Sequence, residues 1–140
     1  YGTVLGSTFA AMFPDKVQRL LIDGVADVQD DYYTTEYKTT VSDADGVLKW
    51  FFKDCLNAGP EKCSFYELSV EAIEERLNTL YQSIIQAPVP VRGVGLIDYT
   101  TLRFVIFNAL YDPLKKWSPM ATALTDLEKG NGTALAELGG

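Results

Sequence analysis

Apolar residues recur at helical spacing through most of the chain after about residue 41. After Ser42 they return every three or four positions, which predicts a helix with one buried face. The same spacing predicts a longer helix over residues 69–86, whose first turns carry glutamates where the helix dipole favours negative charge. The apolar positions are Val47, Leu48, Phe51, Phe52 and Cys55 in the first helix, and Val70, Ile73, Leu77, Leu80, Tyr81 and Ile84 in the second.

Three further helices are expected toward the end of the chain. Residues 98–111 are apolar nearly all round, so this helix is predicted to be well buried. Ser118-Pro119 places a capping residue before a proline, which predicts the start of a fourth helix that ends at Gly130. A short helix is expected over residues 133–138. The intervening stretch "APVPVRGVG" predicts an extended linker, because its prolines and glycines exclude a helix.

The first thirteen residues have a different pattern, with small residues on one side of a predicted helix. Gly2, Gly6 and Ala10 are spaced four apart, which lets such a helix approach a neighbouring element closely. Phe13-Pro14 ends the helix, because the residue before a proline disfavours the helical region.

Residues 17–22 are then almost continuously apolar and close on Asp23-Gly24. A strand with one solvated face would alternate, so this run predicts a buried strand of a parallel sheet. The fold class expected is therefore α/β, with one helix and one parallel strand followed by a mostly helical region. A single strand forms no sheet, so we expect its neighbours, and the rest of a larger domain, outside this chain.

Composition narrows the possible functions. The 140 residues include 12 basic and 19 acidic side chains, a net charge of −7, which argues against a nucleic-acid-binding protein. No apolar run is long enough to cross a membrane. The chain has no histidine, so by itself it can form no Ser-His-Asp triad and no histidine-ligated metal site. Two cysteines are too few for a four-cysteine zinc site, and neither a metal nor an organic cofactor is implied.

The two cysteines, Cys55 and Cys63, form either a disulfide or a pair of buried thiols. A bridge would close a loop of about nine residues and stabilise the fold by about 2.5 kcal/mol through chain entropy. We favour the disulfide, because the helix is expected to end near Gly59-Pro60 and the chain can then turn back. A disulfide indicates secretion or another oxidising compartment. Asn131-Gly132-Thr133 is in addition a glycosylation sequon in an expected loop.

The opening stretch "YGTVLGSTFAAMFPDKVQRLLIDGV" closely resembles the sequence that follows the nucleophile in α/β-hydrolases of the prolyl- and tripeptidyl-aminopeptidase type. In that family a Gly-x-Ser-Tyr-Gly-Thr segment forms the nucleophile elbow. The resemblance implies that the serine directly precedes Tyr1, that the Tyr1 backbone N–H is an oxyanion-hole donor, and that Gly2 leaves the space the elbow needs. The chain is then expected to be a fragment that starts just after the nucleophile.

The remainder of the chain is more loosely similar to the lid of secreted members of this family. The similar segments are "WFFKDCLNAGPEKCSF" and "LYDPLKKWSPMATALTDLEKGNGTAL", although Ser118-Pro119 and Met120 depart from the family pattern. The resemblance implies a core segment over residues 1–28 and a lid, incomplete here, over residues 29–140. It also implies that the catalytic acid and histidine follow Gly140, so that no catalytic residue lies within the chain.

The function that follows is part of a serine peptidase that releases short peptides or amino acids from peptide N-termini through an acyl-enzyme. Its partners would be a peptide or small-molecule substrate and the remainder of its own hydrolase domain. Two alternatives stay open: a hydrolase of esters or small metabolites, and a catalytically inactive fragment or interaction module. The chain alone is predicted to be inactive.

Several residues admit two interpretations. Asp23 could be a catalytic acid, although a turn-forming role is favoured, and the acidic stretch "DVQDDYYTTEY" could hold a substrate amine or form a solvated loop. The aromatic residues of the expected lid are more typical of its core than of a substrate wall. They are Trp50, Phe51, Phe52, Phe104 and Phe107.

Overall fold

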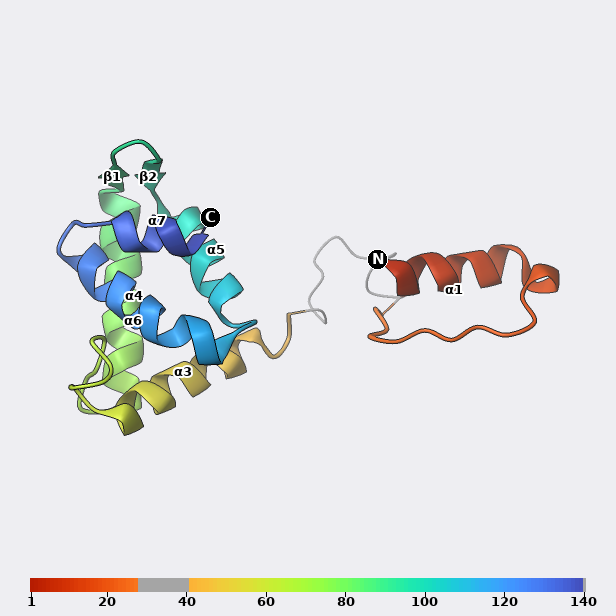
Figure 1. Ribbon diagram of the computed structural model, residues 1–140, viewed down its shortest axis with the longest axis horizontal. Helices are drawn as coiled ribbons and strands as arrows, with labels where there is room; N and C mark the ends of the chain where they lie inside the picture. Colours follow the sequence, from red (N-terminus) through yellow and green to blue (C-terminus); the bar gives the residue numbers. More distant parts are fainter. Residues whose placement is uncertain (28–40, 140) are drawn as a thin grey trace. The chain divides into compact units, whose positions relative to one another are not determined.

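The computed structural model describes residues 1–27 and 41–139, and the chain divides into two compact units (Figure 1). The first unit is Tyr1–Asp43 and the second is Ala44–Gly140.

In residues 1–27, the first unit contains helix α1 and an extended segment that runs back along it (Figure 1). Helix α1 (Gly2–Met12) ends at Phe13 as predicted, and a single 3-10 turn, η1 (Pro14–Lys16), follows it. A β-carbon added at Gly6 would lie 3.4 Å from Ile22 Cγ2, an ordinary van der Waals distance, so Ile22 packs close to α1 at this position. The Thr3 hydroxyl oxygen also accepts a hydrogen bond from the Ala26 backbone N–H at 3.1 Å.

The predicted α/β fold class is wrong for the residues that the structure describes. Residues 17–22 form no strand, and Leu21, predicted to be buried, is 98% exposed. The sheet present in the described ranges has two antiparallel strands and belongs to the second unit. An apolar run becomes a strand only when a neighbouring strand accepts and donates its backbone hydrogen bonds. In the described part of the first unit, α1 lies beside this run instead.

The second unit is a helical domain. It comprises α3 (Ala44–Ala58), α4 (Val70–Gln86), β1 (Val89–Val91), β2 (Gly95–Ile97), α5 (Tyr99–Ala109), α6 (Pro113–Glu128) and α7 (Thr133–Gly139). Its core is apolar, and no buried polar or charged residue occurs among the described residues. The largest fully buried side chains are Phe52, Phe65, Ile73, Leu77, Ile84, Ile97, Leu102, Val105, Met120, Leu124, Leu127 and Leu135.

The helix boundaries follow from local capping chemistry. The Ser69 side chain accepts a hydrogen bond from the Ala72 N–H at 3.1 Å, and Asp98 accepts one from the Thr101 N–H at 2.8 Å. A short polar side chain at this position satisfies a helix N–H that has no intrahelical partner. The predicted helices over residues 69–86 and 133–138 are confirmed as α4 and α7.

The stretch predicted as an extended linker is a β-hairpin. Val89 pairs with Ile97 and Val91 pairs with Gly95, around a turn in which Gly93 has a left-handed φ of 80°. The hairpin packs on the start of α7, since a β-carbon at Gly132 would lie 2.8 Å from both Ile97 Cγ1 and Val91 Cγ2. Tertiary packing therefore fixes a segment that has the composition of a linker.

Helix α5 is not buried on all sides, contrary to the prediction. Leu102, Val105 and Ile106 are buried, but Phe104 is 58% exposed and Phe107 is 37% exposed. Only part of the circumference of α5 meets other elements of this unit, so an apolar sequence all round does not imply burial all round.

Helix α6 begins earlier than predicted. Pro113, not Pro119, occupies its first turn, where a proline leaves no extra backbone group without a partner. Pro119 lies inside the helix. The predicted end is confirmed: Gly130 has a φ of 81° and its N–H donates to the Leu127 carbonyl at 2.9 Å.

Arg76 connects α4 to α6 and to the loop before α4. Its Nε and Nη2 atoms donate to the two carboxylate oxygens of Glu128 at 2.8 and 2.7 Å. Its Nη1 atom donates to the Tyr66 carbonyl at 3.2 Å, and the guanidinium lies 4.3 Å from the centre of the Phe65 ring. Such a bidentate contact fixes both the distance and the orientation of the two helices.

Candidate functional site

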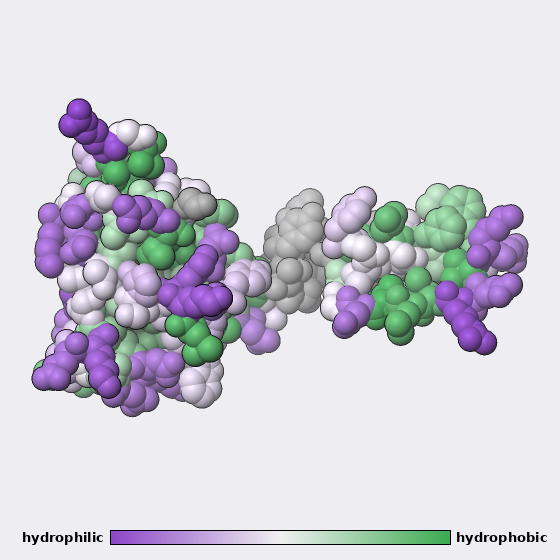
Figure 2. Space-filling view, in the orientation of Figure 1, coloured by the Kyte–Doolittle hydropathy of each residue, from purple (hydrophilic) through white to green (hydrophobic). Residues whose placement is uncertain are grey.

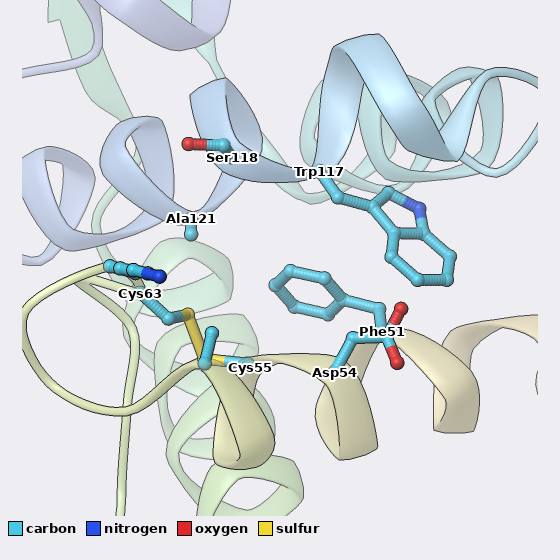
Figure 3. Close-up of a pocket in the computed structure, with 9 residues that line it drawn as sticks. Phe51, Asp54, Cys55, Cys63, Trp117, Ser118 and Ala121 are labelled. Atoms are coloured by element: carbon cyan, nitrogen blue, oxygen red, sulfur yellow. A yellow bond between two sulfur atoms is a disulfide. The ribbon is translucent and has the colours of Figure 1, made fainter.

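A pocket of about 120 Å³ lies between α3 and α6 in the second unit (Figure 3). The residues of α3 that line it share one face of the helix, and the loop that follows α3 closes one side. The lining residues are Phe51, Asp54, Cys55, Ala58, Lys62, Cys63, Trp117, Ser118 and Ala121. We call this the aromatic pocket.

The predicted disulfide is confirmed and forms one wall of the aromatic pocket. Cys55 and Cys63 are bonded, with their Cα atoms 5.3 Å apart, and both are buried. Gly59, with a left-handed φ of 76°, turns the chain after α3, and its carbonyl accepts a hydrogen bond from the Cys63 N–H at 2.9 Å. The local sequence thus returns the second cysteine to the first.

Two aromatic rings form the opposite side of the pocket. Figure 3 shows the Phe51 ring between the Trp117 indole and the Cys55–Cys63 bridge. The Phe51 and Trp117 ring centres are 5.8 Å apart in an edge-to-face arrangement. The Trp117 Nε1 atom is buried without a hydrogen-bond partner among the described residues. In Figure 3 this atom lies on the side of the indole away from the Phe51 ring, so the aromatic pocket offers mainly apolar walls, which suit a small apolar group.

A second concavity, of about 250 Å³, lies where α3, α4 and α5 meet. Its apolar floor includes Phe52 and Leu77, which are 1% and 2% exposed. Its walls carry the polar side chains Asp45, Lys49, Glu74, Asn78, Tyr81 and Arg103. We call this the polar groove. The apolar spacing predicts only that Tyr81 lies on a buried helix face, and no local pattern singles out Arg103, because nothing in either stretch indicates that α4 and α5 bring the two residues together.

The electrostatics of the polar groove centre on Tyr81 and Arg103. Burial raises the pKa of the Tyr81 phenol, and the nearby Arg103 only partly offsets this, so the hydroxyl stays protonated at neutral pH. Burial lowers the pKa of Arg103, but its interaction with Tyr81 and the charge of Asp45 outweigh burial and raise it overall. The guanidinium lies 5.6 Å from the centre of the Tyr81 ring.

The residues that the resemblance singled out, Tyr1 and Gly2, lie in the first unit. Tyr1 is 98% exposed and directly precedes α1, and its carbonyl accepts a hydrogen bond from the Leu5 N–H at 3.1 Å. Gly2 opens α1, and a β-carbon there would meet nothing within 4 Å. Asp23 is exposed at a bend. The oxyanion role of Tyr1 and the elbow role of Gly2 remain predictions.

The other predicted residues lie as follows. Asn131 is exposed just before α7, and its side-chain oxygen accepts a hydrogen bond from the Thr133 N–H at 3.1 Å, while its glycosylation remains a prediction. Trp50 is 60% exposed, whereas Phe51 and Phe52 are buried. The acidic stretch predicted to hold a substrate amine falls almost wholly within residues 28–40, outside the described residues.

No family model, curated protein or solved structure matches the chain. Across residues 1–27 and 41–139, no group of acidic or cysteine side chains has the arrangement of a metal site. None of the helices in those ranges is long and apolar enough to span a membrane.

Proposed function

We propose that the chain is part of a secreted serine peptidase that releases amino acids or short peptides from the N-terminal end of its substrates. The observation that carries this proposal is the run "YGTVLGSTFAAMFPDKVQRLLIDGV", which resembles the segment after the nucleophile in prolyl- and tripeptidyl-aminopeptidases. The second unit would serve as a helical cap that limits the size of the substrate.

The aromatic pocket supports a substrate-binding role for this cap. Its walls include Phe51, Trp117 and the disulfide, and its volume of about 120 Å³ suits a single small side chain. We propose that this pocket receives an apolar side chain of the peptide.

The catalytic groups would come from residues outside these 140. The chain has no histidine, so the histidine of a Ser-His-Asp triad would be supplied by another segment. The nucleophilic serine would directly precede Tyr1, with the Tyr1 backbone N–H donating to the oxyanion, and the acid and histidine would follow Gly140. Serine attack on the scissile amide forms an acyl-enzyme as the C–N bond breaks, and the histidine protonates the departing amine of the remaining peptide. Water then hydrolyses the ester, which releases the N-terminal product and restores the serine.

Secretion is supported by two features of the second unit. The Cys55–Cys63 disulfide is typical of proteins that fold in an oxidising compartment. The exposed sequon at Asn131 provides a site that the glycosylation machinery of such a compartment could modify.

The experiment that tests the proposal uses the native gene product from its source. An antibody raised against residues 44–140 would capture the product after treatment with a fluorophosphonate, which labels only activated serines. We expect a labelled peptide whose modified serine directly precedes Tyr1, and hydrolysis of aminoacyl or tripeptidyl amides. A captured product that takes no label would contradict the proposal. Turnover of simple esters without any amide hydrolysis would replace the peptidase by an esterase.

A further inference from the structure

The polar groove carries four formal charges, none of which forms an ion pair among the described residues, although Asp45 is near enough to Arg103 to raise its pKa. Asp45 and Glu74 are acidic, and Lys49 and Arg103 are basic. The ion pairs among the described residues involve Arg76, Lys115 and Lys129, and none includes a charge of the groove. A concave surface with two unpaired charges of each sign can complement a ligand that itself carries both signs.

An independent feature of the same groove is the Tyr81 hydroxyl. Tyr81 is only 7% exposed, and its hydroxyl oxygen is buried without a hydrogen-bond partner among the described residues. Arg103 lies close enough to this oxygen to lower the pKa of Tyr81, but a guanidinium can only donate, so the phenolic hydrogen still lacks an acceptor. Because the phenol stays protonated, it can donate to an anionic group.

We propose that the polar groove binds a small zwitterion, a free amino acid or a dipeptide, through both of its charged ends. The ligand ammonium group pairs with the carboxylates of Asp45 and Glu74. The ligand carboxylate accepts hydrogen bonds from the Arg103 guanidinium and the Tyr81 hydroxyl, with Lys49 adding positive charge.

The presence of both signs of charge in the groove favours a zwitterion over ligands that carry only one sign of charge. A phosphate or a dicarboxylate would meet Asp45 and Glu74 unfavourably, and a polyamine would meet Lys49 and Arg103 unfavourably. The groove volume of about 250 Å³ is below that of typical drug-sized ligand sites. It therefore suits one or two residues and not a long peptide.

A smaller cavity indicates the preferred side chain. It has a volume of about 40 Å³ and shares Asp45, Leu48 and Arg103 with the groove. Its other walls include Ile106 and Phe107, which are apolar. A space of this size beside the charged groups accepts a small apolar side chain such as a methyl group, so alanine-containing ligands should fit.

This inference needs no catalytic residue and stands whether or not the chain belongs to a peptidase. The test is binding of L-alanyl-L-alanine to the full 140-residue chain, measured by calorimetry and by NMR shifts of groove residues. N-acetyl-alanyl-alanine and alanyl-alanine amide each lack one charge. We expect each to bind at least about tenfold more weakly, because each loses a charge-assisted hydrogen bond.

Variants test the assigned groups against matched controls outside the groove. Arg103→Gln and Asp45→Asn should weaken dipeptide binding about tenfold or more, whereas Arg92→Gln and Asp43→Asn should not. Tyr81→Phe should weaken it about threefold, and Tyr111→Phe should leave it unchanged. Circular dichroism would establish that each variant folds.

Three outcomes would overturn the inference. The first is absence of dipeptide binding to the folded chain. The second is equal binding of the dipeptide and its acetylated or amidated forms. The third is a groove variant that folds and binds as its control does. Failure of the serine-labelling experiment leaves this result unaffected, so the two proposals fail separately.

Discussion

At the scale of single residues, Arg76 shows how one side chain can hold several elements together. Its guanidinium reaches Glu128 on α6, Glu67 and the Tyr66 carbonyl in the preceding loop, and the face of Phe65. The hydrogen bond to Glu128 is the main contribution that raises the pKa of Arg76 against the opposing effect of burial. The planar fork of arginine makes these contacts at the same time, which a lysine ammonium cannot do.

Replacing this side chain should therefore have a measurable cost. We expect Arg76→Lys to lower the free energy of unfolding by about 1 kcal/mol, because a single ammonium cannot reproduce the bidentate contact. The matched control is Lys129→Gln, which removes an exposed pair with Asp126 and should change stability by less than about 0.5 kcal/mol. Urea denaturation measures both. A cost for Lys129→Gln as large as that for Arg76→Lys would contradict this argument.

The Asp98 carboxylate caps the start of α5, and this group titrates in acid. The backbone hydrogen bond from Thr101 is the main cause that lowers the pKa of Asp98 below its ordinary value of 3.8. A pKa that is lower in the folded than in the unfolded state stabilises the fold at pH values above the unfolded-state pKa. This contribution is lost as the pH falls through the folded-state pKa.

The prediction concerns stability in acid. We expect the wild-type chain to lose stability from about pH 4 downward more steeply than Asp98→Ser, which keeps a capping oxygen that does not titrate. Urea denaturation of both proteins in a series of buffers from about pH 2 to about pH 7 would measure the difference between their midpoints. Identical pH profiles for the two proteins would show that the Asp98 cap contributes no proton linkage.

At the scale of elements, two glycines of the second unit have opposite roles. Gly130 ends α6 with a φ of 81°, a conformation that a side chain disfavours. Gly46 lies inside α3 without a positive φ, and a β-carbon there would meet nothing within 4 Å. The first glycine is needed for its conformation, whereas the second only weakens its helix.

Substitution by alanine should separate these roles. Gly130→Ala should destabilise the second unit by about 1 kcal/mol, because the new β-carbon strains the left-handed cap. Gly46→Ala should stabilise it by up to about 1 kcal/mol, because alanine loses less backbone entropy in a helix. Thermal denaturation of both variants measures the signs, and equal signs would refute the distinction.

Helices were predicted correctly where the local sequence contains capping residues and a clear apolar period. The predictions failed where contacts with other elements determine the structure. Helix α4 has a continuous apolar stripe and a serine cap, and its predicted bounds agree with the structure. The hairpin has three-residue strands, too short for a two-residue period to stand out from the prolines and glycines around it. The start of α6 was misplaced because two prolines offer similar local signals, and packing in the second unit continues the helix through Pro119.

At the scale of the whole molecule, the two units differ in how much they bury. The second unit has a continuous apolar core, whereas no described residue of the first unit is buried. Figure 2 shows apolar side chains gathered on the surface of the first unit, where Leu5, Met12 and Val25 are each more than half exposed. Ordering a backbone costs about 1–2 kcal/mol per residue, which only burial of apolar surface can offset.

The units should therefore differ in their ability to fold alone. A polypeptide of residues 44–140 is expected to show the helical circular dichroism and cooperative melting of a folded domain. A polypeptide of residues 1–43 is expected to lack both. Amide hydrogen exchange on the full chain should be fast throughout α1 and slow in the core of α4 and α6. Slow exchange in α1 would mean that the first unit gains stability from contacts outside its own described residues.

What the sequence determined by itself is local: the presence of the helices of the second unit, the bounds of α4, the Gly130 stop, and the proximity of Cys55 to Cys63. These features depend on residues within one or two turns of each other, so spacing and side-chain chemistry are enough to predict them. Tertiary structure alone decided that residues 17–22 form no strand, that α5 leaves Phe104 exposed, and which residues line the two concavities. Phe51 meets Trp117, and Tyr81 meets Arg103, across different helices. Such contacts depend on how helices pack in three dimensions, and no short stretch of sequence encodes that packing.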